Sequence, residues 1–398
     1  MRILGSSLVA FVVGVVFHAS STVLAASAPG AAAGATGGGN AAPVYPKTLT
    51  ELSKYLADPQ PRVIVLQQTF DFRGTEGKKT EKGCVPKFYQ QCVAKNNGFK
   101  AQLELIGPLG CDGTYTTVTY DAAGPKPLRV TGNKTLRGEG TKGVIIGKGL
   151  NIVGHNVIIQ NIHITNLNPQ LVWGGDAITI SGTTGSLSGA PLEKIWIDHV
   201  KISLIGRQMI VVNRAGAKSL TISNSEFDGR TTYSASCDGR HYWTFLIYGK
   251  EVQLTMVNNY IHHTSGRAPK FGGGDGSKTV AVHSANNYWF DNSGHSFDVS
   301  TTANVLIEAN YFEKTAMPLN SNPHGNALVP TAANDNLCLK AIGRKCVQNT
   351  LTSSGKLAGV RENEAIATAK NVASLYKPQA PKKLSAATAN FGVGAFKP

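Results

Sequence analysis

The sequence predicts an all-β protein: a single-stranded, right-handed parallel β-helix with a short N-terminal capping helix and long loops that form a cleft. Short runs rich in β-branched residues recur from residue 157 onward at intervals of 23 to 38 residues, and helical signals are few. Such a period, with abundant Gly and Asn, is typical of a solenoid in which each repeat is one turn of the coil. The runs are Val157–Asn161, Ile195–His199, Leu220–Asn224, Leu254–Asn258, Val282–Asn286 and Val305–Ala309.

Two positions recur with these runs. An apolar or aromatic residue lies three places after the fifth position, as expected if inward side chains stack from one turn to the next. Asn fills the fifth position of four runs, and we expect these amides to form a ladder that bonds the backbone at a sharp, left-handed bend. A β-sandwich is less favoured, because such a fold has turns about every 8 to 12 residues. The apolar positions are Ile164, Ile202, Phe227, Ile261, Trp289 and Phe312, and the ladder positions are Asn161, Asn224, Asn258 and Asn286.

One helix is predicted near the N-terminus. Thr48 and Glu51 have the spacing of a capping box, and Leu49, Leu52 and Leu56 share one helical face. We expect this helix to cover the open end of the solenoid, where unpaired backbone would invite aggregation. The Gly/Ala-rich stretch 27–42 has few bulky apolar residues and is expected to be a flexible lead-in.

Residues 1–25 have the pattern of a secretory signal peptide. Arg2 precedes an apolar run from Ile3 to Phe17, and small residues end the segment at Ala25. A membrane anchor is the less favoured alternative, because the run is shorter than the ~20 apolar residues of a bilayer span. We expect a secreted, extracellular protein that is not bound to membranes. Residues 26–398 are expected to form one domain and a monomer, since no linker divides them and solenoids grow without splitting.

Six cysteines in a secreted chain indicate three disulfides, for which the sequence alone permits fifteen pairings. Cys338 and Cys346 are close enough to close one short loop. A zinc site is disfavoured because no Cys-x-x-Cys pair occurs.

The formal net charge of +15 suits a polyanionic partner. Nucleic acid is one such partner, but the Lys and Arg residues are scattered and no nucleic-acid-binding motif occurs. A solvated basic surface and a surface that steers an acidic substrate remain as interpretations of equal weight.

Five motifs in the middle of the chain combine charged and aromatic residues. In the same order and with similar spacing, they occur in fungal-type pectin lyases of polysaccharide lyase family 1, within the pectate lyase superfamily, which this chain resembles over nearly all of its mature length. The motifs are Trp173-Gly-Gly-Asp176, Trp196-Ile-Asp-His199, Ile205-Gly-Arg-Gln208, Cys237-Asp-Gly-Arg-His-Tyr-Trp243 and Ser265-Gly-Arg-Ala-Pro-Lys270.

The resemblance implies endo-type β-elimination of methyl-esterified galacturonan, with Arg267 as the base that removes the proton on C5. Leaving an arginine neutral near pH 8.5 costs roughly 5 to 7 kcal/mol, so nearby cations must lower its pKa. We expect Lys270 and Arg207, the latter from an adjacent rung, to do so and to stabilise the enolate. These three and Asp176 are the predicted catalytic residues.

The resemblance also implies that no cofactor or metal is needed. Pectate lyases place acidic calcium ligands near Asp176, but here Arg207 stands where further carboxylates are expected. Calcium requires about 6 to 8 oxygen ligands, which this site cannot easily provide. We therefore expect Asp176 to pair with Arg207, and an esterified substrate needs no divalent ion to neutralise its carboxylate.

Aromatic rings are expected to line the cleft, because flat rings suit the less charged faces of esterified sugars. Asp198 and His199 are expected to form buried hydrogen bonds that order neighbouring rungs. By resemblance, Cys84 pairs with Cys111 and Cys92 with Cys237. Asn133 begins an N-glycosylation acceptor sequence. The predicted substrate-binding residues are Trp173, His241, Tyr242 and Trp243.

Three other functions compete with a pectin lyase. A calcium-dependent pectate lyase is disfavoured by the few carboxylates near Asp176. A polygalacturonase would share the β-helix, but hydrolysis needs two positioned carboxylates and no dense acidic cluster occurs. A non-catalytic β-helix that binds cell-wall polysaccharide would keep the aromatic rings without requiring Arg267, Arg207 and Asp176 together.

Overall fold

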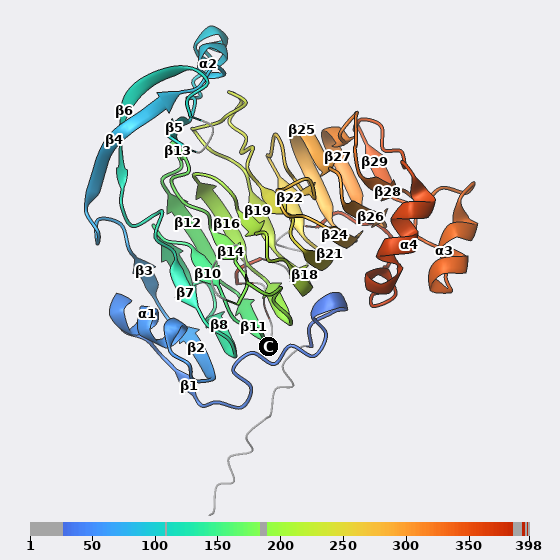
Figure 1. The fold of residues 1–398 in the computed structure, drawn as a ribbon, viewed down its shortest axis with the longest axis horizontal. Helices are drawn as coiled ribbons and strands as arrows, with labels where there is room; N and C mark the ends of the chain where they lie inside the picture. The colour runs from blue at the N-terminus through green and yellow to red at the C-terminus, as the bar shows by residue number, and fades with distance from the viewer. Residues whose placement is uncertain (1–26, 108–109, 184–188, 385–391, 395, 397–398) are drawn as a thin grey trace, which may run out of the picture.

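The structure, a computed structural model, describes residues 27–107, 110–183, 189–384, 392–394 and 396. The predicted signal peptide lies outside the described residues. Within the described part, no helix is both long and apolar enough to cross a membrane. The chain winds into an elongated coil of parallel strands, which confirms the predicted right-handed parallel β-helix (Figure 1).

The coil has three faces, which we call A, B and C. Face A is a ten-stranded parallel sheet. Its strands are β1 (Pro43–Val44), β2 (Arg62–Leu66), β8 (Lys134–Gly138), β11 (Val157–Gln160), β15 (Ile195–Asp198), β18 (Ala217–Ser223), β21 (Glu251–Val257), β24 (Thr279–Ala285), β26 (Ala303–Glu308) and β28 (Asn326–Leu328).

Faces B and C belong to one folded sheet, joined where the long strand β25 (Tyr288–Val299) pairs with strands of both faces. Face B consists of β3 (Thr69–Asp71), β9 (Val144–Ile146), β12 (His163–Leu167), β16 (Lys201–Ile205), β19 (Glu226–Asp228) and β22 (Tyr260–His262), and it continues through β25 to β27 (Tyr311–Leu319) and β29 (Thr350–Thr352). Face C consists of β7 (Leu128–Val130), β10 (Leu150–Ile152), β14 (Ile178–Ile180), β17 (Ile210–Val212), β20 (Phe245–Ile247) and β23 (Lys270–Phe271).

A small four-stranded sheet projects from the coil beside the N-terminal end of face C (Figure 1). It contains β4 (Lys78–Val85), β5 (Leu103–Leu105), β6 (Thr114–Asp121) and β13 (Leu171–Val172), and helix α2 (Tyr89–Lys95) lies in the loop between β4 and β5. The three predicted disulfides all form: Cys84–Cys111, Cys92–Cys237 and Cys338–Cys346. The second joins α2 to the long loop before β20, 145 residues away in sequence.

The predicted repeat is confirmed by the strand register. The first residues of the six runs, from Val157 to Val305, are register partners along face A. The six apolar positions, from Ile164 to Phe312, are register partners along face B, and each is 0% exposed. Each turn of the coil therefore buries its own side chains against identical positions of the next turn.

The predicted asparagine ladder is displaced by one residue. The four predicted asparagines do adopt the left-handed conformation at the bend, with φ between 49° and 56°. However, the amides that bond one another from turn to turn follow Asn258 and Asn286 directly: Asn259 donates to Asn287 at 2.8 Å, and Asn287 donates to Asn310 at 3.1 Å. The predicted bonds to the backbone are confirmed for two bend residues, because Asn161 donates to the carbonyls of Gly138 and Gly140 and Asn286 donates to that of Ala309. The residue after the bend forms the ladder of amides.

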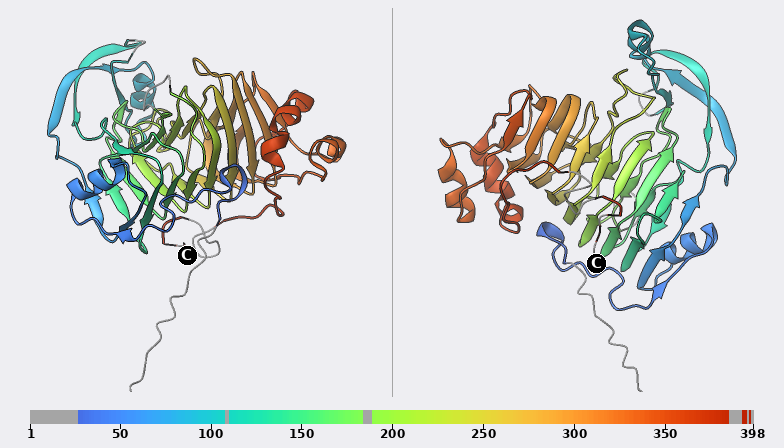
Figure 2. Two further views of the ribbon diagram at one scale, coloured as in Figure 1. Left: turned by 60° about the horizontal axis from the view of Figure 1, so that its bottom comes forward. Right: turned by 180° about the vertical axis from the view of Figure 1, so that it is seen from behind.

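Helices lie near both ends of the coil, and α4 (Glu362–Ala373) packs across the outer side of face A (Figure 2). Helix α1 (Leu49–Ala57) begins with the predicted capping box of Thr48 and Glu51 and buries Leu52 and Leu56 at the N-terminal end. Helices α3 (Asp335–Ile342) and α4 pack at the other end, where α4 lies against β26 and β28.

The prediction of a flexible lead-in is wrong. The segment includes a short 3-10 helix, η1 (Gly30–Ala32), which lies against β18 and β21 of face A. Two of its backbone N–H groups, those of Ala31 and Ala32, donate to Thr255 and Thr221 at 2.9 Å. Small residues make this approach possible, because a Cβ on Gly30 would lie 2.3 Å from the Thr255 hydroxyl. Backbone bonding thus holds a segment that has few apolar side chains.

Candidate active site

The residues predicted to carry the chemistry lie in loops that enter neighbouring strands of face C. Because β14, β17, β20 and β23 are consecutive in that face, the loops bring these residues into one line along the axis of the coil. Trp173 and Asp176 precede β14, Arg207 precedes β17, Tyr242 and Trp243 precede β20, and Arg267 precedes β23.

Arg207 is held between an aromatic ring and a carboxylate. Its Cζ lies 3.5 Å from the centroid of the Trp173 ring, and its Nη1 lies 4.0 Å from Oδ2 of Asp176. The other carboxylate oxygen of Asp176 accepts a hydrogen bond from the backbone N–H of Gln208 at 2.8 Å. The predicted Asp176–Arg207 pair is therefore confirmed, and it fixes the guanidinium at the edge of face C.

Burial dominates the electrostatics of this pair. It lowers the pKa of Arg207, an effect that Asp176 opposes and Arg267 reinforces. Burial also raises the pKa of Asp176, while Arg207 acts in the opposite direction. The contacts of this carboxylate are thus a guanidinium and a backbone N–H group, neither of which offers the oxygen ligands that calcium binds.

Arg267 is mostly buried, and its backbone has a left-handed conformation. Its Cζ lies 4.7 Å from the Trp243 ring centroid, and its backbone N–H donates to Nε2 of His295 at 3.3 Å. The residue has a φ of 45°, a left-handed conformation that costs a non-glycine residue of the order of 1 kcal/mol. Burial lowers the pKa of Arg267, although Tyr242 and Asp298 oppose this shift.

The two cations that we expected to lower the pKa of Arg267 do not have the predicted positions or surroundings. Lys270 does not act as an uncompensated neighbouring cation, because its Nζ forms an ion pair with Asp298 at 2.9 Å. Arg207 lies two rungs from Arg267, since β20 separates β17 from β23. Desolvation, more than repulsion between cations, favours the neutral arginine here.

Tyr242 and Trp243 form the wall beside Arg267. Their rings meet edge to face at 4.8 Å between centroids, and the indole N–H of Trp243 donates to Oε1 of Gln102 at 3.0 Å. Gln102 in turn donates to the backbone carbonyls of Pro169 and Gly206, next to Arg207. The aromatic wall is thus tied to the loop that carries Arg207.

His241 does not have the substrate-contacting position predicted for it. It is 3% exposed, and its Nε2 lies 2.8 Å from the carbonyl oxygen of Arg207 and 3.1 Å from that of Trp243. Burial lowers its pKa to about 4, so the ring is neutral and donates its Nε2 proton to these carbonyls near neutral pH. His241 therefore positions the two site loops from below the surface.

Asp198 and His199 form the expected buried hydrogen bonds. The carboxylate of Asp198 lies 2.6 Å from Nδ1 of His199 and accepts hydrogen bonds from Gln160 and Ser223 on the adjoining turns of face A. Asp198 is 1% exposed. These contacts link successive turns of face A and do not reach face C.

Sequence reasoning missed His295, Asp298 and Gln102. The repeat itself could have pointed to His295 and Asp298, because β25 is the next rung after β23. Asp298 is the register partner of Lys270 in that rung. A pocket of about 260 Å³ also adjoins the site, bounded by Trp173, Asp176, Arg207, Thr179, Pro125 and Pro127 together with Gly124 and Gly175.

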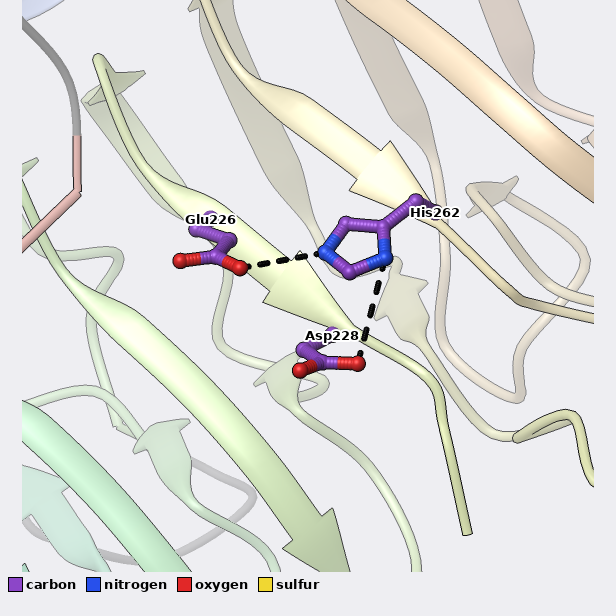
Figure 3. Close-up of side chains that lie close together, drawn as sticks. All are labelled: Glu226, Asp228 and His262. Carbon is purple, nitrogen blue, oxygen red and sulfur yellow. Dashed lines mark hydrogen bonds and ion pairs between the residues drawn. The ribbon is translucent and has the colours of Figure 1, made fainter. Parts of the chain in front are cut away.

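A different group of titratable side chains lies on face B (Figure 3). Glu226, Asp228 and His262 place their ligand atoms within 4.8 Å of one another. Lys201 lies 3.1 Å from Glu226, and Arg230 lies 2.6 Å from Asp228. The two cations already balance the carboxylates, so the group is an ion-pair network of the β-helix wall.

The fold and the site define a β-helical protein that carries a line of arginines and aromatic rings along one face of its coil. Residues 111–356 match the family described as pectate lyase. The chain is 47% identical over 371 residues to a probable pectin lyase F of Aspergillus flavus, covering 92% of this chain and 82% of that one. It is 43% identical over 342 residues to pectin lyase B of Emericella nidulans, covering 84% and 85%. The chain belongs to the pectate lyase family.

Solved structures show the same fold. A pectate lyase of Bacillus sp. N165 in complex with trigalacturonate aligns with a TM-score of 0.51 and 17% identity over 92% of this chain and 98% of that one. A pectate lyase of Paenibacillus sp. 0602 aligns with a TM-score of 0.52 and 15% identity over 93% and 96%.

Proposed function

We propose that this protein is a pectin lyase that cleaves α-1,4-linked, methyl-esterified galacturonan by β-elimination, within the chain and without a metal ion. The observation that carries the proposal is the line of Arg207 and Arg267 along face C, both mostly buried and both with lowered pKa. The curated relatives named as pectin lyases support the choice of substrate.

The reaction requires three events, and the site offers groups for two of them. Neutral Arg267 takes the C5 proton, and the guanidinium of Arg207, fixed by Trp173 and Asp176, stabilises the negative charge that develops on the ester carbonyl oxygen. The electron pair of the C5–H bond becomes the C4–C5 double bond as the C4–O bond breaks. The leaving oxygen takes a proton from solvent.

Methyl esterification explains why an arginine can replace a metal. A free carboxylate adjacent to C5 carries charge that opposes proton removal, whereas an ester is neutral and makes the C5 proton more acidic. One fixed cation at Arg207 then suffices for the developing enolate. We infer that the protein needs no calcium, in contrast with a site built from several carboxylates.

Three further properties belong to this proposal. The N-terminal signal pattern and the three disulfides support secretion. The fold buries its apolar faces within one chain, as expected for a monomer. Asn133 is exposed at a bend before β8, which makes its acceptor sequence accessible to a glycan.

The test uses highly methylated pectin and polygalacturonate, each with and without EDTA, and follows the ultraviolet absorbance of the unsaturated product. A chelator-insensitive rise on methylated pectin is expected. A rise only on polygalacturonate that EDTA abolishes would identify a calcium-dependent pectate lyase. No rise on either polymer, with binding retained, would identify a non-catalytic polysaccharide-binding protein.

A further inference from the structure

A single row of outward-facing side chains runs along the whole of face C. Its strands are in register, and the alternating burial of β7, β10 and β14 shows that their middle residues point away from the core. The register partners of these residues on the other strands continue the row, in which Val211 is buried. The row is Arg129, Asn151, Thr179, Val211, Leu246, Lys270 and Asp298.

This row lies on the face whose strands the site residues precede. Thr179 lines the pocket beside Trp173 and Arg207, and Lys270 begins the strand that Arg267 enters. Sugars of a chain bound along the line of site residues therefore lie over successive members of the row.

The charges of the row are unevenly placed. Lys270 and Asp298 neutralise each other, and the four positions from Asn151 to Leu246 carry no charge. Arg129 is exposed, and within the described residues its side chain makes no hydrogen bond or ion pair. The row thus has one uncompensated charge, at its N-terminal end.

Arg129 is also close in the sequence to the pocket lining. It follows Pro127 by two residues, and Pro125 and Pro127 line the pocket together with Arg207. Five strand steps separate β7 from β23 in face C, roughly 24 Å at the usual spacing of about 4.8 Å between strands. A cation at this distance lies several sugars from the bond that is cleaved.

We propose that Arg129 binds the free carboxylate of an unesterified galacturonate at a fixed position several sugars from the cleavage point. The uncharged centre of the row accepts methyl-esterified sugars, whereas the guanidinium of Arg129 pairs with a carboxylate, as arginine does with planar anions. The preferred substrate is then a methylated stretch with an unesterified sugar at one end. This inference rests on the proposed lyase activity.

The test compares wild type with Arg129→Gln on two pectins of equal length, one almost fully methylated and one partly de-esterified at random. On the partly de-esterified pectin, KM of the variant is expected to rise about three-fold, the effect of losing one exposed ion pair. On the fully methylated pectin KM should not change. The difference in KM between wild type and Arg129→Gln on the partly de-esterified pectin should disappear in about 1 M salt, where the screening length is only about 3 Å.

Two variants control the measurement. Arg129→Lys keeps the charge and should retain most of the wild-type preference. Arg137→Gln removes an arginine from β8 of face A, away from the cleft, and should behave as wild type on both polymers.

Mass spectrometry of the products gives a second readout. Wild type should release oligosaccharides with unesterified sugars enriched at one position relative to the unsaturated end, and Arg129→Gln should lose this enrichment. An unchanged product pattern and equal KM values in Arg129→Gln would overturn the inference while leaving the lyase activity intact. If wild type released no unsaturated product from either pectin, the proposed function itself would fail.

Discussion

Arg207 lies over the ring of Trp173, with 3.5 Å between its Cζ and the ring centroid, while its Nη1 lies 4.0 Å from the carboxylate of Asp176. An aromatic face and a carboxylate thus restrain one guanidinium from two sides, one by cation–π attraction and one by charge. This relationship gives the site a fixed positive group and explains several expected outcomes of mutation.

Replacing Trp173 with Ala should weaken the restraint on Arg207. The lost cation–π contact is worth about 0.5–2 kcal/mol. We expect kcat/KM on methylated pectin to fall by about three- to thirty-fold, measured by absorbance of the unsaturated product. Trp173→Phe, which keeps a ring, should fall less. Equal losses in both variants would mean that the aromatic face does not position Arg207.

Arg267→Lys should fold normally and lose most turnover. Lysine cannot place a guanidinium nitrogen over the Trp243 ring, and a lost general base typically costs about 10²–10⁴-fold in rate. Circular dichroism and the thermal midpoint serve as the folding control. Near-native turnover would remove Arg267 from the role of base.

Arg207→Asp tests whether the arginine takes the place of a metal. The change sets a second carboxylate beside Asp176, which supplies oxygen ligands of the kind calcium prefers. We expect the variant to be nearly inactive without calcium and to gain activity on polygalacturonate when calcium is added. Arg207→Asn, which removes the charge without adding a carboxylate, is the matched control and should not respond. A calcium response in neither variant would leave metal replacement without support.

Because His241 is buried, we expect the free energy of unfolding to depend on pH. Its folded-state pKa of about 4 is below its ordinary value of 6.5. Between these values the unfolded chain binds a proton that the folded chain does not, so stability present above pH 6.5 is lost as the pH falls to about 4, by about 3 kcal/mol at most.

The measurement is urea unfolding of wild type and His241→Gln across this pH range. The glutamine amide can still donate to a carbonyl, and the variant should show a shallower decline of the unfolding free energy with falling pH. His163→Gln on face B should show a similar change, because burial also lowers the pKa of His163 to about 4. Identical slopes in wild type and both variants would contradict the prediction.

Asn287 should be among the most sensitive positions of the coil. Its amide is 0% exposed and bonds Asn259, Asn310 and the carbonyl of Met256. Alanine leaves buried partners unsatisfied, so we expect a loss of about 3 kcal/mol in the unfolding free energy, measured with denaturant. Asn336→Ala, at an exposed position of α3, should change stability little. A small loss at Asn287 would mean that water replaces the amide.

Much of the fold was predictable from local pattern. The six runs and the six apolar positions after them fall in register because each turn carries its own inward side chains. The capping box of Thr48 and Glu51 is likewise a local signal. The asparagine ladder was placed one residue too early, since the amides that bond one another directly follow the left-handed bend.

Within the site, the residue types were predictable but several partners were not. Motif order identified Arg267, Arg207, Asp176 and the aromatic residues, because these segments are contiguous in the sequence. The ion pair of Lys270 with Asp298 joins residues from two rungs, and the bond from Trp243 to Gln102 joins a loop of the coil to the segment before β5 of the small sheet. Loops of unequal length separate the rungs, so sequence distance alone does not say which side chains meet.

The order of residues was thus enough for the β-helix, its N-terminal cap, the short Cys338–Cys346 loop and the line of reactive side chains, since these depend on short-range periodicity and contiguous motifs. The other two disulfides followed only from the resemblance to a known family, because their partners are far apart in the sequence. Only the tertiary structure decided that His241 lies beneath the site, that Lys270 is neutralised, and that Arg129, at the end of the row, has no charged partner among the residues that the structure describes. The physical reason is that burial and the pairing of charges are properties of the stacked turns, and they do not exist until the coil closes around its core.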